Sequence, residues 1–188
     1  MQFKFFVLSG FILFCLIIAL LEGARPTAIA QTAGKILPYG AKSEIIPPKK
    51  KGKLLTWLKA GIYKKRYIAE PQVHSSTGPH GGNVRTYYNP ILTQNILDGK
   101  KVWQPGAAMV KELYFSGNEQ VIGYSVMIKL DENSGTHGEG WLFYETFDGT
   151  NTNPFFGRGL PICANCHQAG VDYLLSPFRP QSIFNSQF

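Results

Sequence analysis

Cysteine is scarce in this chain of 188 residues: it has three, and two of them, Cys163 and Cys166, lie close together near the C-terminal end. The third, Cys15, falls inside an apolar N-terminal run. So few cysteines exclude a small domain held together by several disulfides. A disulfide between Cys163 and Cys166 would close a very small loop and add little stability. The pair therefore needs a chemical explanation.

Acidic residues are also few, twelve against nineteen Lys and Arg, which gives a net charge of +7. The excess is local, because residues 31–70 hold ten basic and two acidic residues, whereas residues 71–188 hold seven and nine. A domain that binds nucleic acid usually carries a basic face. The nearly neutral larger part of the chain therefore predicts no nucleic-acid partner.

Residues 1–30 have the features of a secretory signal peptide. Lys4 precedes an almost unbroken apolar run, Phe5–Leu21, and residues 28–30 (Ala-Ile-Ala) fit a cleavage site. An N-terminal membrane anchor is the alternative, with the run at the short edge of what a spanning helix needs. In both cases we expect the rest of the chain to be exported, either free in a bacterial periplasm or anchored in the inner membrane and facing the periplasm.

Residues 31–72 form a basic extension. After Pro47 and Pro48, the segment Lys53–Tyr67 has leucines at helical spacing. We expect a short helix that packs on the domain by one apolar stripe. The alternative is docking on an anionic membrane surface or on an acidic partner protein, because lysines crowd both ends of the segment.

Long helical periodicity is missing from residues 73–188, where short strand patterns occur instead. The clearest is Gln120–Leu130, in which apolar residues fill every second position. Further strands are expected at Asn83–Asn89, Ala107–Phe115 and Gly140–Phe147, and a short helix at Ile91–Gly99. We therefore predict a single α+β domain built on an antiparallel sheet with a few short helices, in which Ala107–Phe115 and Gln120–Leu130 form a hairpin.

The two late cysteines belong to a C-x-x-C-H sequence at residues 163–167, the attachment motif of a c-type haem. Two thiols at this spacing reach both vinyl groups of one porphyrin, and the histidine turns its imidazole onto the iron. We predict one covalently attached haem c near the C-terminus. Cys163 and Cys166 would form the thioethers, and His167 would be the proximal iron ligand.

Two other uses of the cysteine pair fit less well. A thioredoxin-like pair opens a helix within a βαβ unit, which this β-rich chain does not predict. A zinc site needs two further ligands. The remaining histidines, His74, His80 and His137, are dispersed in loops, where a histidine is most often a polar surface residue.

Methionine is absent after His167, although small electron-carrier cytochromes c usually place a methionine ligand downstream of the motif. Met109 and Met127 precede it in expected strands, where packing in the core is their ordinary role. We therefore expect an open or weakly ligated distal site on the iron. Such a site binds or converts small molecules instead of only carrying electrons.

The order of the sequence blocks resembles the cytochrome P-460 family and the related β-sheet cytochromes c′. The blocks are GNVRTYYNP, PGAAMVKELY, GYSVMIKL, GWLFYETF and CANCHQAGVDYLLSPF. In that family a lysine in a VKEL strand bonds covalently to the porphyrin edge, which the resemblance places at Lys111. A distal arginine corresponds to Arg85. Members that oxidise hydroxylamine carry a carboxylate on the next strand, where this chain has Ser125.

The residues themselves partly support these positions. Lys111 would share a strand face with Met109, which is unusual for a solvated lysine; an edge-strand lysine facing water is the alternative. Arg85 could stabilise an anionic bound species or a haem propionate, or form a surface ion pair. A serine hydroxyl is a poor proton acceptor at neutral pH. The sequence does not place any of the nearby carboxylates, Glu112, Glu139 and Glu145, in the pocket.

The resemblance implies an exported monohaem cytochrome that performs redox chemistry on small nitrogen species such as hydroxylamine or nitric oxide. As a haem oxidoreductase it would use Lys111 and Arg85 as catalytic residues, pass electrons to a redox partner protein and form a homodimer. A non-catalytic protein that binds nitric oxide and a simple electron-transfer cytochrome are the alternatives.

Overall fold

The computed structural model describes residues 42–76, 78–115 and 120–175. The expected signal peptide or anchor lies outside these residues. None of the helices in the described segments is long and apolar enough to span a membrane. In chain order the elements are α1 (Lys42–Ile45), α2 (Lys51–Lys59), the 3₁₀ helix η3 (Ile62–Lys65), β1 (Ile68–Ala69), β2 (His74–Ser75), β3 (Asn83–Tyr88), α3 (Pro90–Leu97), β4 (Ala108–Tyr114), β5 (Val121–Lys129), β6 (Trp141–Thr146), β7 (Phe155–Arg158) and α4 (Pro161–His167).

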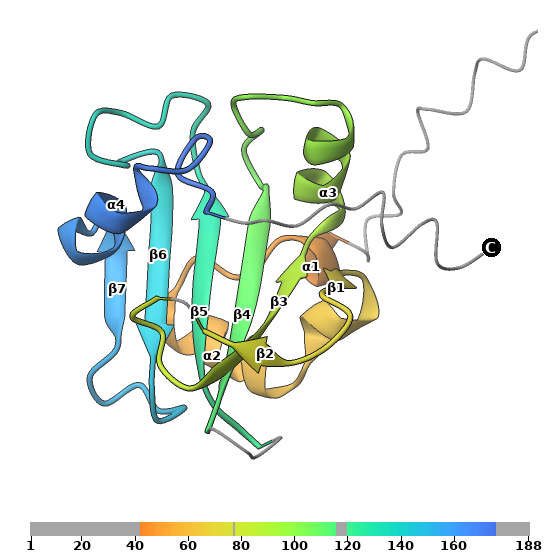
Figure 1. The fold of residues 1–188 in the computed structure, drawn as a ribbon, viewed down its shortest axis with the longest axis vertical. Coiled ribbons are helices and arrows are strands. Elements are labelled where there is room, and N and C mark those ends of the chain that lie inside the picture. Colours follow the sequence, from red (N-terminus) through yellow and green to blue (C-terminus); the bar gives the residue numbers. More distant parts are fainter. Residues whose placement is uncertain (1–41, 77, 116–119, 176–188) are drawn as a thin grey trace, which may run out of the picture. The chain divides into compact units, whose positions relative to one another are not determined.

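The strands form one seven-stranded sheet in which every pairing is antiparallel. The order is β1-β3-β4-β5-β6-β7, and β2 also pairs with β3. Figure 1 shows the sheet with α2 behind it and α4 in front of β6 and β7.

The α+β class, the antiparallel sheet and the short helices are as predicted. The four expected strands correspond to β3, β4, β5 and β6, the expected hairpin is β4–β5, and the expected helix at Ile91–Gly99 is α3.

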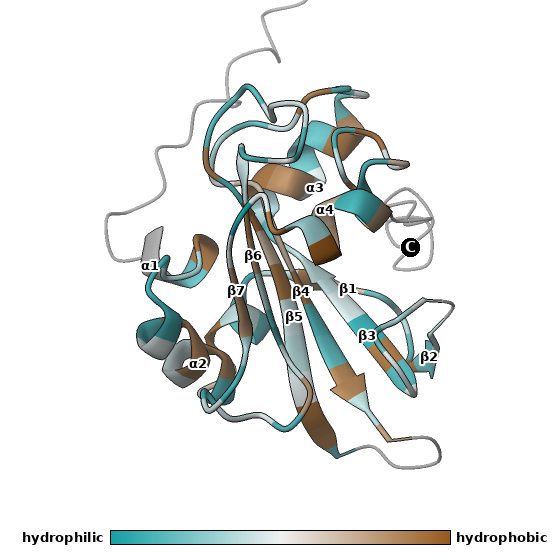
Figure 2. Cartoon of the chain, turned by 90° about the vertical axis from the view of Figure 1, so that its left-hand side faces the viewer, coloured by the Kyte–Doolittle hydropathy of each residue, from teal (hydrophilic) through white to brown (hydrophobic). Residues whose placement is uncertain are grey.

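Alternation along the strands gives the sheet two faces. We call the face that packs on α2 the rear face; it carries Val110, Val126 and Tyr144. We call the opposite face, which packs on α3 and α4, the pocket face; it carries Met109 and Met127. Figure 2 shows the sheet edge-on, with apolar segments of the strands between the helices on its two sides. Both faces of the central strands are therefore buried.

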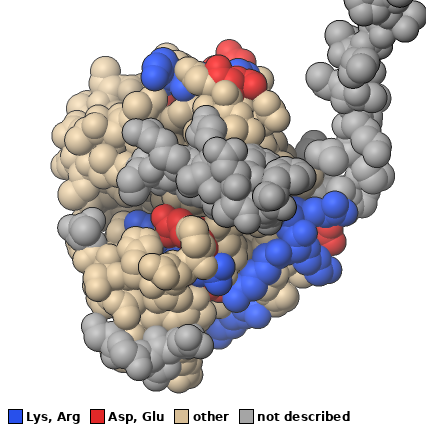
Figure 3. Space-filling view, turned by 45° about the vertical axis from the view of Figure 1, so that its right-hand side comes forward, with Lys and Arg blue, Asp and Glu red and all other residues tan. Residues whose placement is uncertain are grey.

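Helix α2 belongs to the core on the rear face. Leu54 and Leu58 are almost fully buried, and the aromatic rings of Tyr63 and Tyr67 lie in the same cluster. The expected apolar stripe is present, but the helix ends before Gly61, whose φ of 63° turns the chain into η3. Because this segment shares its core with β3 to β6, the packing shows no boundary at residue 72. The lysines of α2 and η3 are exposed, and Figure 3 shows basic side chains gathered on one side of the molecule.

The contribution of α2 can be measured. We expect Leu54→Ala to lower the free energy of unfolding by about 2–5 kcal/mol, because it empties a fully buried position. Lys53→Ala, on the exposed side of the same helix, should change it by no more than about 0.5 kcal/mol. Chemical denaturation of both variants tests this. Equal stability of Leu54→Ala and the unmutated protein would contradict the placement of α2 in the core.

Candidate functional site

A pocket of about 550 Å³ lies on the pocket face of the sheet. Its floor comes from β3, β4, β5 and β6, α4 lines one side, and the loop between β2 and β3 lines another. Figure 1 shows this loop passing in front of β5 toward β6. The apolar side chains of the lining include Met109, Met127, Phe143 and Phe155. The volume is within the range of about 300–1,000 Å³ that is usual for pockets that hold cofactors and other small ligands.

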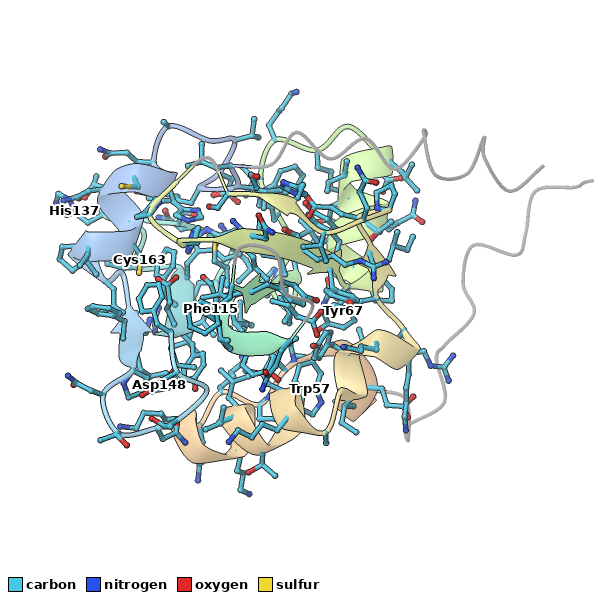
Figure 4. All side chains as sticks on the ribbon, turned by 60° about the horizontal axis from the view of Figure 1, so that its bottom comes forward. Trp57, Tyr67, Phe115, His137, Asp148 and Cys163 are labelled. Carbon is cyan, nitrogen blue, oxygen red and sulfur yellow. The ribbon has the colours of Figure 1, made fainter. Side chains whose placement is uncertain are left out.

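Helix α4 brings the three motif residues to this pocket. Pro161 occupies the start of the helix, where its missing N–H has no cost. Residues three and four apart share one face of a helix, and Cys163, Cys166 and His167 all line the pocket. Both cysteines are free thiols. Burial raises the pKa of the half-buried Cys163 to about 11, so this thiol is protonated at neutral pH. Figure 4 shows Cys163 on the side of α4 that faces the strands.

His167 is buried and has a defined orientation. Its Nδ1 donates a hydrogen bond to the Tyr173 carbonyl oxygen at 2.9 Å. Burial lowers the pKa of His167, and the hydrogen bond to Tyr173 opposes this only in part. A neutral imidazole that donates from Nδ1 keeps a lone pair on Nε2. Histidines that bind metals usually have this second-nitrogen hydrogen bond.

The Tyr173 carbonyl is itself held in place by a buried ion pair. Asp172 and Tyr173 both have positive φ, 45° and 68°, which is uncommon for residues other than glycine. The Asp172 carboxylate accepts from Lys129 Nζ at 2.7 Å and from the Trp103 backbone N–H at 2.8 Å. Lys129 is fully buried, and its Nζ also lies 5.1 Å from the centre of the Trp141 ring. This cluster fixes the turn that orients His167.

Lys111 is the only lysine among the described residues that line the pocket. It pairs with Ser125 on β5, which in turn pairs with Glu145 on β6, so the three residues form a row across the pocket face. Burial lowers the pKa of Lys111, while the nearby carboxylates of Glu70 and Glu145 raise it and leave a net decrease. Lys111 therefore belongs to a central strand and lines the pocket, so the alternative of an edge-strand lysine that faces water is wrong.

Two carboxylates that the sequence did not place line the pocket, those of Glu70 and Glu145. The strand after the lysine strand has Ser125, but the following strand supplies Glu145 beside it. Glu139 is exposed in the loop between β5 and β6. Glu112 lies on the rear face, where it accepts hydrogen bonds from Tyr63, Tyr87 and Tyr114 and pairs with Lys64. Alternation along β6 places Glu145 and Phe143 on the same face of the sheet. The proximity of Glu145 to Lys111 follows only from the pairing of β6 with β5 and of β5 with β4.

His80 also belongs to the pocket, so its interpretation as a surface residue is wrong. Its side chain is 12% exposed, and its Nδ1 is 2.6 Å from Glu145 Oε1. The rings of His80 and His167 have their centres 6.2 Å apart, with an angle of 67° between the planes. His74 lines the pocket rim but is largely exposed, and His137 lies in an exposed loop at the outer edge (Figure 4). Within the described residues no three His, Cys, Asp or Glu side chains are grouped to hold a metal ion.

Arg85 does not line the pocket. It pairs with Glu112 on β4 and therefore shares the rear face. Its Nε donates to the Glu70 carbonyl oxygen at 2.9 Å, and its guanidinium lies 5.5 Å from the centre of the Tyr87 ring. The distal position expected for Arg85 is thus corrected: its neighbours Val84 and Thr86 point to the pocket instead. The structure brings together Lys111, Ser125, Cys163, Cys166 and His167, but not Arg85.

Comparison with known proteins does not assign the chain to a family. No protein-family model matches it, and no curated protein matches it. The functional interpretation therefore depends on the motif of α4, on the pocket and on the side chains that line it.

Proposed function

We propose that the pocket binds one haem c, attached through Cys163 and Cys166 and ligated by His167, and that the chain is an exported redox cytochrome. One observation carries this proposal: the three residues of the attachment motif share one face of α4 and line the same apolar pocket. The residues fit the group. Two free thiols can form thioethers, and the buried imidazole of His167 offers Nε2 to a metal.

Haem iron supplies electron transfer and binds small molecules such as nitric oxide. On the sheet side of the pocket, Lys111 is the residue that would react with the porphyrin. Because burial lowers its pKa, a larger fraction of its amine is neutral and nucleophilic. This property suits the covalent bond to the porphyrin edge that the resemblance to cytochromes P-460 implies for Lys111.

Glu145 supplies the proton acceptor that Ser125 cannot provide. Oxidation of hydroxylamine releases protons, and a carboxylate within the pocket can accept them. Glu145 is buried beside Ser125, and its carboxylate accepts a hydrogen bond from His80 Nδ1, which holds it in position in the pocket. We therefore propose redox chemistry on small nitrogen species such as hydroxylamine or nitric oxide. The redox partner protein, the homodimer and the exported location stay predictions.

Simple electron transfer is the second candidate function. The observation in its favour is the position of His80, whose ring centre lies 6.2 Å from that of His167. Two imidazoles this close can both ligate one iron, which leaves no open position for substrate.

Haem attachment can be tested with the three cysteines. Expressed in a host that matures c-type cytochromes, the full chain should carry one haem that survives denaturation and acid extraction. The double variant Cys163→Ser/Cys166→Ser should lose covalent haem, because no thioether can form. Cys15→Ser, outside the motif, should keep it. Mass spectrometry of the purified proteins measures the outcome, and haem-free unmutated protein would contradict the proposal.

The role of Lys111 has a spectroscopic signature. If Lys111 is bonded to the porphyrin edge, the reduced protein should have a red-shifted Soret band, and Lys111→Met should return it to the position of an ordinary c-type haem. Lys101→Met, at an exposed position, serves as the control and should leave the band unchanged. A spectrum that is the same with and without Lys111 would exclude the cross-link.

Turnover tests the role of Glu145. With hydroxylamine and an artificial electron acceptor, Glu145→Gln should lower kcat by about 10²–10⁴-fold, since a general base contributes about this much. Glu132→Gln, in an exposed loop, should have unchanged kcat. Undiminished turnover by Glu145→Gln would show that this carboxylate accepts no proton in the reaction. Absence of turnover in the unmutated holoprotein would favour the electron carrier.

A further inference from the structure

The rings of His80 and His167 are separated by the distance expected for two ligands of one metal ion. Their centres lie 6.2 Å apart. An imidazole nitrogen binds a metal at about 2 Å, and the ring centre lies about 1 Å further, so two imidazoles on opposite sides of one ion have centres about 6 Å apart. The two histidines come from different parts of the fold, the loop between β2 and β3 and the end of α4.

In each of the two histidines Nδ1 is hydrogen bonded, and no described residue forms a hydrogen bond with Nε2. His167 donates from Nδ1 to the Tyr173 carbonyl oxygen. The Nδ1 of His80 is hydrogen bonded to Glu145 Oε1 at 2.6 Å, and a carboxylate oxygen accepts, so His80 donates and keeps its lone pair on Nε2. A carboxylate on the second nitrogen is the usual support of a histidine that ligates a metal.

The other histidine of the pocket lacks this property. The Nδ1 of His74 is 3.0 Å from the Ser75 carbonyl oxygen and its Nε2 is 3.1 Å from Glu70 Oε2. Both nitrogens are engaged, and the side chain is 46% exposed, against 12% for His80. His80 is therefore the candidate ligand, and His74 in the same pocket is a suitable control.

The backbone that carries His80 is fixed on its C-terminal side. Gly81 and Gly82 have positive φ, 68° and 44°. A side chain at Gly82 would collide with the Tyr114 carbonyl at the end of β4. Only glycine fits this close approach. The contact between Gly82 and the end of β4 therefore restricts the backbone that follows His80.

We propose that His80 is the sixth ligand of the haem iron, on the side opposite His167, and that Glu145 orients its imidazole. This inference rests on the haem attachment proposed above and revises the expectation of an open distal site. Nε2 of His80 donates its lone pair to the iron, and no other bond of the protein changes. A small molecule such as nitric oxide then reaches the iron only by displacing His80.

Absorption and electron paramagnetic resonance spectra of the ferric holoprotein test the assignment. We expect the unmutated protein to be six-coordinate and low-spin. His80→Ala should lose the low-spin signal and become high-spin, and free imidazole should restore it, which also shows that the variant has kept its fold. His74→Ala should stay low-spin.

The same spectra distinguish a failure of the haem attachment from a failure of the His80 assignment. A protein without covalent haem overturns both the proposed function and the ligand assignment. A protein with covalent haem that is high-spin, or in which His80→Ala remains low-spin without imidazole, overturns the His80 assignment alone. Loss of the low-spin signal in Lys111→Met but not in His80→Ala would overturn it as well and make the Lys111 amine the ligand.

Discussion

The register of the antiparallel strands β3 to β6 decides what the pocket contains. Side chains alternate between the two faces, so the pairing of β4 with β5 and of β5 with β6 aligns Lys111, Ser125 and Glu145 in one row beneath α4. The residues next in sequence, such as Glu112, face α2 instead. A slip of one residue would exchange the two sets. The register is held because both faces of the central strands bury apolar side chains.

The two imidazoles of His80 and His167 are each oriented by a hydrogen bond from Nδ1. The orientation of His167 follows from the Tyr173 carbonyl, which the buried pair of Lys129 and Asp172 keeps in place. The orientation of His80 follows from Glu145. Unpaired charges are costly in such surroundings, so these polar groups are fixed in position. A largely apolar lining with a few fixed polar groups is typical of a pocket that binds a cofactor or another small ligand.

Sequence patterns predicted the central strands and α3 because their signals are local. The alternation of Gln120–Leu130 and the Asn89-Pro90 step that starts α3 need no distant contact. The two-residue strands β1 and β2 have no such signal. The distal position of Arg85 came from the family resemblance, and alternation could not correct it, because β3 has buried side chains on both faces, Tyr87 and Tyr88. His80 and Glu145 meet only through the course of a loop, which no local pattern encodes.

A crystal structure of the exported, haem-loaded protein would reveal whether one haem lies between α4 and the β2–β3 loop, with its iron between two histidines. We expect thioether bonds to Cys163 and Cys166 and an iron ion bound by Nε2 of His167 and Nε2 of His80. An iron ion with water or a vacant position opposite His167, and with His80 turned away, would contradict the His80 assignment. A haem bound outside this pocket would contradict the whole account.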